Sequence, residues 1–257
     1  MQLTQLYLSS VEIVAAMMTA LWLLSLILEN SSIVDIFWGA GFVIVNLFAF
    51  CFSQHATRQI ILTILVTLWG LRLSAHVFLR NAGKHEDFRY AQWRKESRRG
   101  WWWVSFFKVF VLQGIILLII ASPLITGQAA GRQRPLVIFD YFGIMVWVIG
   151  FFFEAVGDYQ LATFKSVPSN KGKILTSGLW TYTRHPNYFG DSVQWWGFYF
   201  LAAASGAWWT IFSPILMTVL LLRVSGVTLL EKTMSARHGY EEYTHSTNAF
   251  VPWFPKK

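Results

Sequence analysis

Long apolar stretches separated by short polar connections run through this chain. A helix that crosses the hydrocarbon layer of a membrane needs about 20 mainly apolar residues. Seven stretches suit such helices: residues 7–28, 33–52, 59–80, 104–125, 137–159, 189–204 and 207–227. The sixth is short and meets the seventh at Ser205 and Gly206, which favours a tight hairpin there. The pattern predicts an all-α integral membrane protein, built as a seven-transmembrane-helix bundle.

Composition and charge add an orientation to this picture. Hydrophobic residues make up 55% of the chain and charged residues 13%, outside the usual balance of soluble proteins. Fifteen Lys and Arg residues fall in the connections after residues 80 and 159 and in the C-terminal tail, against three on the other side, Arg58, Arg132 and Arg134. Because basic loops stay cytoplasmic, we expect the N-terminus outside and the C-terminus in the cytoplasm. The net charge of +8 then reflects topology and attraction to anionic membrane lipids.

Several classes of function are excluded by what the sequence does not contain. Cys51 is the single cysteine, so neither an internal disulfide nor a CxxC metal site can form. The six histidines show no HxxxH or HExxH spacing, and we expect no metal. No nucleic-acid-binding module is visible, so no nucleic acid partner is expected. The sequence predicts one membrane domain over residues 1–257.

Ionisable residues inside the predicted helices are the first candidates for a site. Burying a charge at membrane depth costs at least about 2.5–3.5 kcal/mol, so such residues need a reason. Asp35 lies at the start of a helix and is either a helix-start group or a site residue. Arg72 is about two turns from its helix end, which favours a site or a buried pair. Arg223 is close enough to its helix end to reach the interface.

Glu154 and Asp158 form a second candidate, because their spacing of four places them on one face of a helix. Two like charges at this spacing repel. The pair therefore predicts a cationic or hydrogen-bonding group between the two carboxylates.

The densest polar chemistry lies in residues 178–191, Gly-Leu-Trp-Thr-Tyr-Thr-Arg-His-Pro-Asn-Tyr-Phe-Gly-Asp, followed by Trp195-Trp196-Gly197. Arg184 can grip phosphate oxygens through its fork of donors. His185 can add a donor or stack, and the Asn187 amide suits a carboxamide such as that of nicotinamide. Further rings, hydroxyls and a carboxylate come from Tyr182, Tyr188 and Asp191. The plainer interpretation is an interfacial loop whose aromatic residues anchor to lipid headgroups.

This run resembles the hallmark of the bacterial membrane proteins related to steroid 5-alpha-reductases. The chain is also similar to that family at residues 34–39, 86–90 and 250–255, Val-Asp-Ile-Phe-Trp-Gly, Glu-Asp-Phe-Arg-Tyr and Phe-Val-Pro-Trp-Phe-Pro. The resemblance implies a multi-pass protein of the bacterial inner (cytoplasmic) membrane that reduces the carbon–carbon double bond of an enone. NADPH would lie among the cytoplasmic helix ends and loops, and the substrate would be a lipophilic steroid-like or isoprenoid molecule.

Residue roles follow from the resemblance and from the buried charges. The substrate side would occupy residues 1–125 and the cofactor side residues 126–257. The expected cofactor-binding residues are Arg72, Asp158, Lys165, Tyr182, Arg184, His185, Asn187, Tyr188, Asp191, Arg223, Glu231 and Tyr243. In steroid reductases a Glu of helix 2 and a Tyr of helix 3 hold the substrate carbonyl. Asp35 would stand in for that Glu as the catalytic acid, but residues 68–72, Leu-Trp-Gly-Leu-Arg, contain no Tyr.

A second enzyme class shares part of the pattern. Arg-His-Pro-x-Tyr followed by a Gly-Tyr-x-x-Tyr tail also resembles membrane methyltransferases of the isoprenylcysteine type, which use S-adenosylmethionine. Those usually carry a Glu-Glu pair just after the last helix, where this chain has Glu231-Lys232, and Glu241-Glu242 comes later. Asn187 and the Trp195-Trp196-Gly197 run favour the reductase. A non-enzymatic lipid-binding membrane protein is the third alternative.

Overall fold

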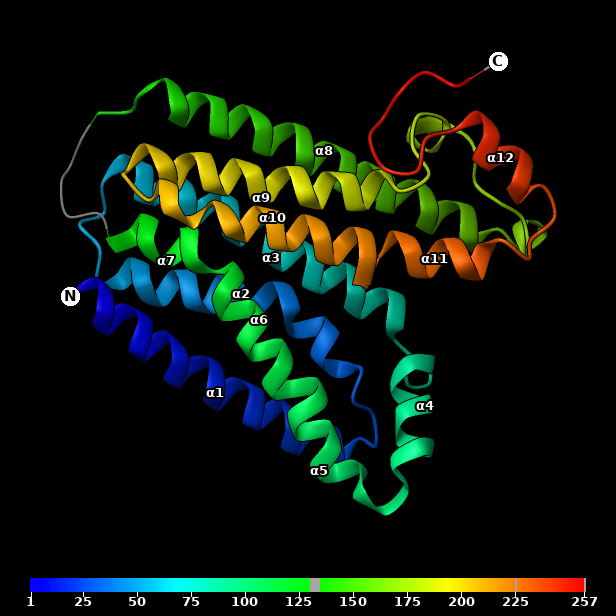
Figure 1. Ribbon diagram of the computed structural model, residues 1–257, viewed down its shortest axis with the longest axis horizontal. Coiled ribbons are helices and arrows are strands. Elements are labelled where there is room, and N and C mark those ends of the chain that lie inside the picture. Colours follow the sequence, from blue (N-terminus) through cyan, green and yellow to red (C-terminus); the bar gives the residue numbers. More distant parts are fainter. Residues whose placement is uncertain (130–134, 225, 257) are drawn as a thin grey trace. The chain divides into compact units, whose positions relative to one another are not determined.

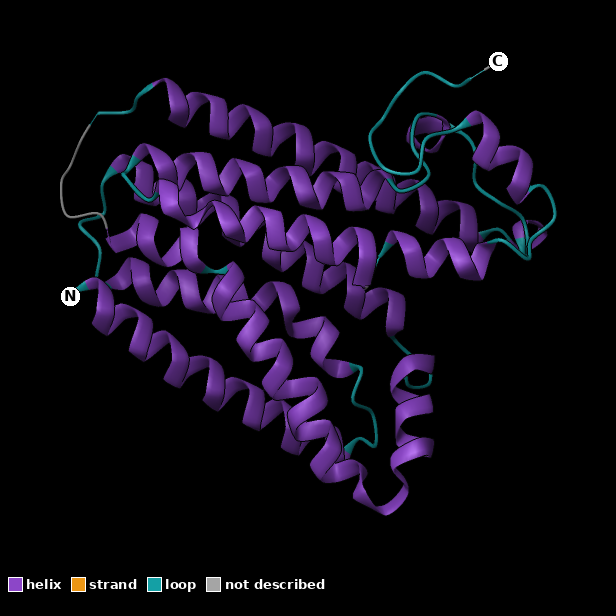
Figure 2. Ribbon diagram, in the orientation of Figure 1, coloured by secondary structure: helices purple, strands orange, loops and turns teal. Residues whose placement is uncertain are grey.

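The protein is helical throughout the residues that the structure describes. The computed structural model covers residues 1–129, 135–224 and 226–256, and its regular elements are all helices (Figure 1, Figure 2). It divides into two compact units, Met1–Leu136 with Ser205–Ala207 and Val137–Ala204 with Trp208–Lys257. Arg132, Arg134 and Lys257, which enter the charge count above, lie outside the described residues.

The first unit is built on the pair of helices α2 and α3. Its elements are α1 (Leu3–Ile27), α2 (Ile33–Cys51), α3 (Thr57–Asn81), α4 (Phe88–Ser97), η1 (Arg98–Gly100), α5 (Trp101–Ser105), η2 (Phe106–Val111), α6 (Leu112–Ile120) and α7 (Ser122–Ala129). The helices α2 and α3 touch backbone to backbone, since a Cβ atom added at Gly39 would lie 2.3 Å from the carbonyl oxygen of Gly70. This contact fixes the first turns of α2, where Asp35 lies.

The second unit is built on the pair α8 and α9, which run side by side (Figure 1). Its elements are α8 (Ile138–Ser166), η3 (Pro168–Asn170), η4 (Gly178–Thr181), α9 (Pro186–Ala204), η5 (Trp208–Ile211), α10 (Phe212–Val219), η6 (Leu220–Val224), α11 (Val227–Met234) and α12 (Tyr240–Ser246). Again glycine allows the approach, because a Cβ atom at Gly190 would lie 2.3 Å from the backbone nitrogen of Glu154. Polar side chains on the two helices are thereby brought within bonding distance.

Six of the described helical segments are long and apolar enough to cross a membrane. They are Leu3–Ile27, Ile33–Cys51, Thr57–Asn81, Phe88–Ile120, Ile138–Ser166 and Trp208–Met234. Each overlaps one predicted span, so the chain is a multi-pass membrane protein. The predicted span 189–204 lies in α9, where polar residues of the signature lower the apolar content, and a seventh span stays a prediction. The same holds for the predicted orientation of the termini.

One predicted span has different bounds in the structure. Residues 104–120 of the predicted segment 104–125 belong to a longer run that starts at Phe88, contains the π-helical turn η2, and ends at Ile120. The chain then breaks at Ala121 and restarts as α7 with Pro123 at its second position. Proline carries no backbone N–H and clashes with the preceding turn, so a continuous helix through this point is disfavoured.

The surface carries large apolar side chains, unlike that of a soluble protein. Large apolar side chains such as Ile138 and Leu79 are 76% and 73% exposed, as expected of a surface that lipid covers. Polar side chains lie inside instead, among them Asn46 and Gln128 in the first unit and Glu154 in the second. The interior polar groups therefore mark where a site can be built.

Candidate functional site

The first unit contains a cluster around Asp35, in the first turn of α2. The Tyr90 hydroxyl donates to Asp35 Oδ1 at 2.8 Å, and Arg89 Nη2 donates to Asp35 Oδ2 at 3.3 Å. Gln113 Nε2 donates in turn to the Tyr90 hydroxyl oxygen at 3.1 Å. Asp35 thus binds a phenol and a guanidinium from another segment, which makes it more than a helix-start group.

The segment 86–94 holds these donors against the start of α2. Glu86 accepts from the backbone nitrogen of Ser31 at 2.6 Å and from Arg94 Nε and Nη2 at 2.9 Å each. Asp87 begins α4 by accepting the Arg89 backbone N–H at 3.0 Å. Sequence reasoning sought a Tyr on helix 3 and missed Tyr90, although the Glu-Asp-Phe-Arg-Tyr motif that contains it was already apparent.

The second unit contains the signature run, whose conformation is fixed from α8. Gly178 adopts a φ of 67°, in the region that favours glycine. The next residue, Leu179, donates its backbone N–H to Gln160 Oε1 at 3.0 Å, and the Trp180 indole donates to the carbonyl of Gly157 at 3.2 Å. The run then turns into α9 at Pro186, where the fixed φ of proline suits a first helical position.

Both buried carboxylates of α8 bind amides of α9. Asn187 Nδ2 donates to Asp158 Oδ1 at 3.0 Å, and Gln194 Nε2 donates to Glu154 Oε2. The sequence predicted a cationic or hydrogen-bonding group between the two carboxylates, whereas each carboxylate has an amide partner of its own. In both pairs the amide oxygen, Asn187 Oδ1 or Gln194 Oε1, is buried without a hydrogen-bond partner among the described residues.

Arg184, His185 and Glu231 form the centre of a third set of contacts. Arg184 donates from Nε to Glu231 Oε1 at 2.9 Å and from Nη2 to Oε2 at 2.7 Å. His185 Nε2 lies 2.9 Å from Glu231 Oε1, and the Tyr240 hydroxyl donates to the same oxygen at 2.7 Å. Tyr240 was not foreseen, although it opens the Gly-Tyr-x-x-Tyr element that the sequence displays.

Electrostatics favours this arrangement. Burial alone would lower the pKa of the Arg184 guanidinium, but its bonds to Glu231 outweigh burial and raise that pKa. Burial and the bond to Glu231 raise the pKa of Tyr240, which keeps its hydroxyl a donor. The Arg184 guanidinium was expected to bind cofactor phosphates, but it binds the carboxylate of Glu231 instead. Its Nη1 also donates to the carbonyl oxygens of Thr244 and Thr247.

The C-terminal tail closes over the same run through backbone atoms. Arg184 N donates to the carbonyl of Asn248 at 2.9 Å, and Trp253 N donates to that of Tyr182 at 2.9 Å. The Thr183 hydroxyl lies 3.2 Å from the carbonyl oxygen of Ala249 and 2.8 Å from that of Phe250. We refer to residues 248–253 as the strap.

The remaining predicted site residues have different surroundings. Tyr243 donates its hydroxyl to the carbonyl of Trp180, and the Tyr188 ring stacks on His185 with centroids 5.8 Å apart. Asp191 is buried in α9, whereas Lys165, Tyr182 and Arg223 are exposed. Arg72 lies half-buried in α3 and belongs to the first unit. The structure therefore brings together most, but not all, of the predicted set.

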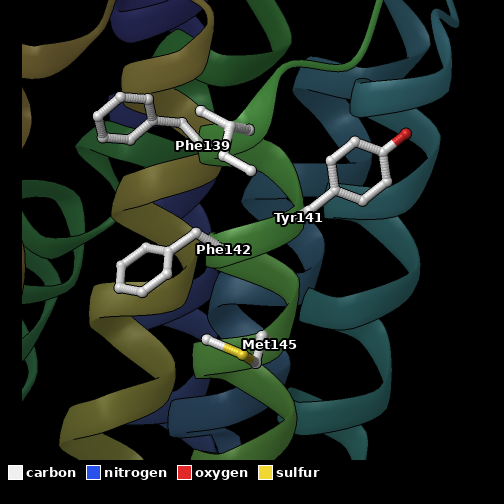
Figure 3. Close-up of a pocket in the computed structure, with 5 residues that line it drawn as sticks. Phe139, Tyr141, Phe142 and Met145 are labelled. Carbon is white, nitrogen blue, oxygen red and sulfur yellow. The ribbon is translucent and has the colours of Figure 1, made fainter.

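An apolar hollow of about 370 Å³ beside α8 is a weaker candidate. Its lining is Ile138, Phe139, Tyr141, Phe142 and Met145. Phe139 and Phe142 point to one side of α8 and Tyr141 to the other (Figure 3). No charged group lines it, so it offers little to orient a reactive ligand and suits contact with lipid chains.

The fold and these clusters define a multi-pass helical membrane protein with buried polar clusters in each of its two units. The chain belongs to the family described as protein of unknown function (DUF1295), whose model matches residues 21–247. That family includes steroid 5-alpha-reductase-like membrane proteins.

Two relatives show how far the similarity extends. A protein of Schizosaccharomyces pombe described as uncharacterized is 26% identical over 266 residues, which cover 90% of this chain and 75% of that protein. The probable O-methyltransferase ustE of Ustilaginoidea virens is 39% identical over 64 residues, 25% of this chain and 22% of that protein. No solved structure matches the chain.

Proposed function

We propose that this protein is an NADPH-dependent reductase that saturates the carbon–carbon double bond of an enone in a lipophilic substrate. The observation that carries the proposal is the pair of Asp35 and Tyr90. Steroid 5-alpha-reductases, which the sequence resembles, use a carboxylate and a tyrosine at the substrate carbonyl. This chain has no tyrosine at residues 68–72, but α4 supplies one at 2.8 Å from the carboxylate.

The first-unit residues suit the polarisation of a carbonyl oxygen. A Tyr90 hydroxyl that turns from Asp35 to the carbonyl would donate its hydrogen there, while Gln113 continues to donate to the phenol oxygen. Hydrogen bonds in a chain strengthen one another, so the bond from Gln113 makes the hydroxyl a better donor. Arg89 meanwhile holds the Asp35 side chain in place through its bond to Oδ2. A proton delivered to the α carbon would complete the reduction.

The second-unit residues suit the amide end of the cofactor. Because the Asp158 carboxylate only accepts, it fixes the Asn187 amide with Nδ2 toward it and Oδ1 away. The buried Oδ1 can then accept from the carboxamide of nicotinamide. NADPH, when bound, would supply the hydride and leave as NADP⁺. Exposed lysines such as Lys171 and Lys173 are suited to bind its phosphates, including the 2′-phosphate.

Cofactor binding by the purified protein tests this proposal. A ligand that binds only the native state raises its stability by mass action, so NADPH should raise the melting temperature and NADH much less. Asn187→Ala should weaken NADPH binding by about 2- to 12-fold and should also lower the stability of the apo protein, because Asp158 loses its amide donor. With cholest-4-en-3-one as probe, mass spectrometry should detect a product with two additional hydrogens. Equal shifts with NADH and NADPH, or none with either, would overturn the assignment.

A methyltransferase is the second candidate, and the 64-residue similarity to a probable O-methyltransferase favours it. S-adenosylmethionine would then be the cofactor, and Asp35 and Tyr90 would have no role at a carbonyl. Mass spectrometry of small molecules retained by the detergent-purified protein separates the two candidates. Retained S-adenosylmethionine, with a melting-temperature increase from it alone, would replace the reductase by the methyltransferase.

A further inference from the structure

His185 has one ring nitrogen bound and the other buried without a partner. The side chain is 5% exposed, and Nε2 lies 2.9 Å from Glu231 Oε1. Nδ1 is buried and makes no hydrogen bond to any of the residues that the structure describes. In a protein interior such an atom is an exception that calls for an explanation, because buried polar atoms are nearly always paired.

The contacts of Glu231 determine which nitrogen of His185 carries the hydrogen. Glu231 Oε1 accepts from Arg184 Nε and the Tyr240 hydroxyl, and Oε2 accepts from Arg184 Nη2. A carboxylate that takes so many donors is ionised and can only accept. His185 Nε2 must therefore carry a hydrogen. In the neutral imidazole, Nδ1 is then a bare acceptor.

We propose that His185 contacts the bound ligand through Nδ1, which accepts a hydrogen bond from an N–H or O–H of that ligand. Glu231 is a positioning residue, because it fixes the ring and its tautomer without touching the ligand. The sequence alone placed His185 and Glu231 together as cofactor contacts, and the structure separates their roles.

The chemistry of Nδ1 restricts what it can bind. A phosphate or carboxylate oxygen carries only lone pairs and would be repelled by a bare acceptor. An amide N–H or a ribose hydroxyl supplies the missing donor. The inference rests on the proposed function for the identity of the ligand, since NADPH carries both donor types. It places the phosphates of the cofactor away from His185.

Two substitutions test the roles of the two ring nitrogens of His185 one at a time. His185→Gln retains an amide that reaches the Nε2 position and can still donate to Glu231, but it removes the atom at the δ position. His185→Asn retains a polar atom at the δ position and removes the bond to Glu231. We expect His185→Gln to keep the apo melting temperature and to raise the Kd for NADPH about 2- to 12-fold. His185→Asn should lower the melting temperature and change the Kd less.

The tautomer of His185 and the NMR signal of its Nδ1 can be measured directly. If His185 had only a structural role, NADPH would not change that signal. In ¹⁵N NMR spectra of histidine-labelled protein in nanodiscs, the signal lost in His185→Gln identifies His185. We expect the free protein to show hydrogen on Nε2 and a bare Nδ1, and we expect NADPH to shift the Nδ1 resonance. Hydrogen on Nδ1 in the free protein would overturn the inference.

The outcomes distinguish this inference from the proposed function. If His185→Gln binds NADPH as tightly as the wild type, His185 is structural and the inference falls while the reductase stands. If the wild type binds S-adenosylmethionine instead of NADPH, and His185→Gln weakens that binding, the reductase falls and the inference stands. If neither cofactor binds the wild type, both fall.

Discussion

The two units hold their buried carboxylates in different ways. In the first unit, Asp35 binds a guanidinium and a phenol, Arg89 and Tyr90. In the second, Asp158 and Glu154 bind the amides of Asn187 and Gln194. Because the guanidinium is a second donor to Asp35, the phenol hydrogen can be redirected while Asp35 stays bonded. An amide satisfies a hydrogen bond only, and its own oxygen remains an acceptor.

The difference indicates what each unit can offer a ligand. The cluster at Asp35 presents a hydroxyl donor, which suits a carbonyl oxygen. The turn at the start of α9 presents acceptors, Asn187 Oδ1 and His185 Nδ1, which suit N–H and O–H groups. A further contrast is that the second cluster is tied to the tail by Glu231 and the strap. We therefore expect variants of the first cluster to lose turnover and variants of the second to lose stability.

The largest effect should come from Tyr90→Phe. Removal of a group that donates to the reacting carbonyl costs about 100- to 10,000-fold in rate. Turnover of an enone probe should fall by that order, while the melting-temperature increase caused by NADPH stays as in the wild type. Tyr141→Phe, at an exposed tyrosine of α8, is the matched control and should be silent. If Tyr90→Phe had the turnover of the wild type, the expectation that variants of the first cluster lose turnover would be contradicted.

Arg184→Met should have the next largest effect, on stability. It leaves Glu231, which is 25% exposed, without its cation, and two carbonyl oxygens without their donor. Breaking a fully buried pair costs about 3–5 kcal/mol, and partial exposure reduces this to about 2–3 kcal/mol. Denaturation of the apo protein in mild detergent measures the loss. Lys232→Met, at an exposed neighbour, should change stability by less than about 0.5 kcal/mol. An equal loss in both variants would show that Glu231 does not depend on Arg184.

Gly190→Ala tests whether the contact between α8 and α9 keeps the amide–carboxylate pairs in register. The added Cβ would lie 2.3 Å from the backbone nitrogen of Glu154, so the helices must separate. Overpacking of this kind costs about 1–3 kcal/mol, and we expect weaker NADPH binding as well. Gly100→Ala, with no atom within 4 Å of the new Cβ, is the control. Unchanged binding in Gly190→Ala would uncouple the helix contact from the site.

Thr183→Val should have the smallest effect. It keeps the shape of a fully buried side chain and removes the hydroxyl that contacts the carbonyl oxygens of Ala249 and Phe250. The loss of one such donor costs about 0.5–1.5 kcal/mol. Proteolysis of the strap, followed by mass spectrometry, should be faster than in the wild type. Thr233→Val, at an exposed threonine of α11, should leave the rate unchanged, and equal rates in the two variants would contradict a holding role for Thr183.

The sequence could predict most of the membrane helices, because the length and apolarity of a segment are properties of the segment itself. The bounds of the predicted spans 7–28, 33–52 and 59–80 lie within four residues of those of α1, α2 and α3. Where this reasoning was less successful, polar residues were the cause. In α9 the signature contributes half of the helix, and its polar groups bind α8 rather than face lipid.

The site could be predicted only in part, because partners from distant segments leave no local pattern. A spacing of four showed that Glu154 and Asp158 share a face, but not that amides of α9 would bind them. The bond from Tyr90 to Asp35 spans 55 residues, and the bond from Arg184 to Glu231 spans 47. The sequence shows the residues of each motif, but only the fold shows which of these residues bind one another.

The strap has a consequence for the order of events during synthesis. The carboxylate of Glu231 and the strap carbonyls that accept from Arg184 and Thr183 lie 47 to 67 residues further along the chain. At about 5–20 residues per second, the signature turn waits on the order of seconds beside the ribosome before its carboxylate and strap emerge. During that interval the Arg184 guanidinium has no carboxylate from Glu231. The contacts around Arg184 are thus completed late in synthesis, only after Glu231 and the strap have been made.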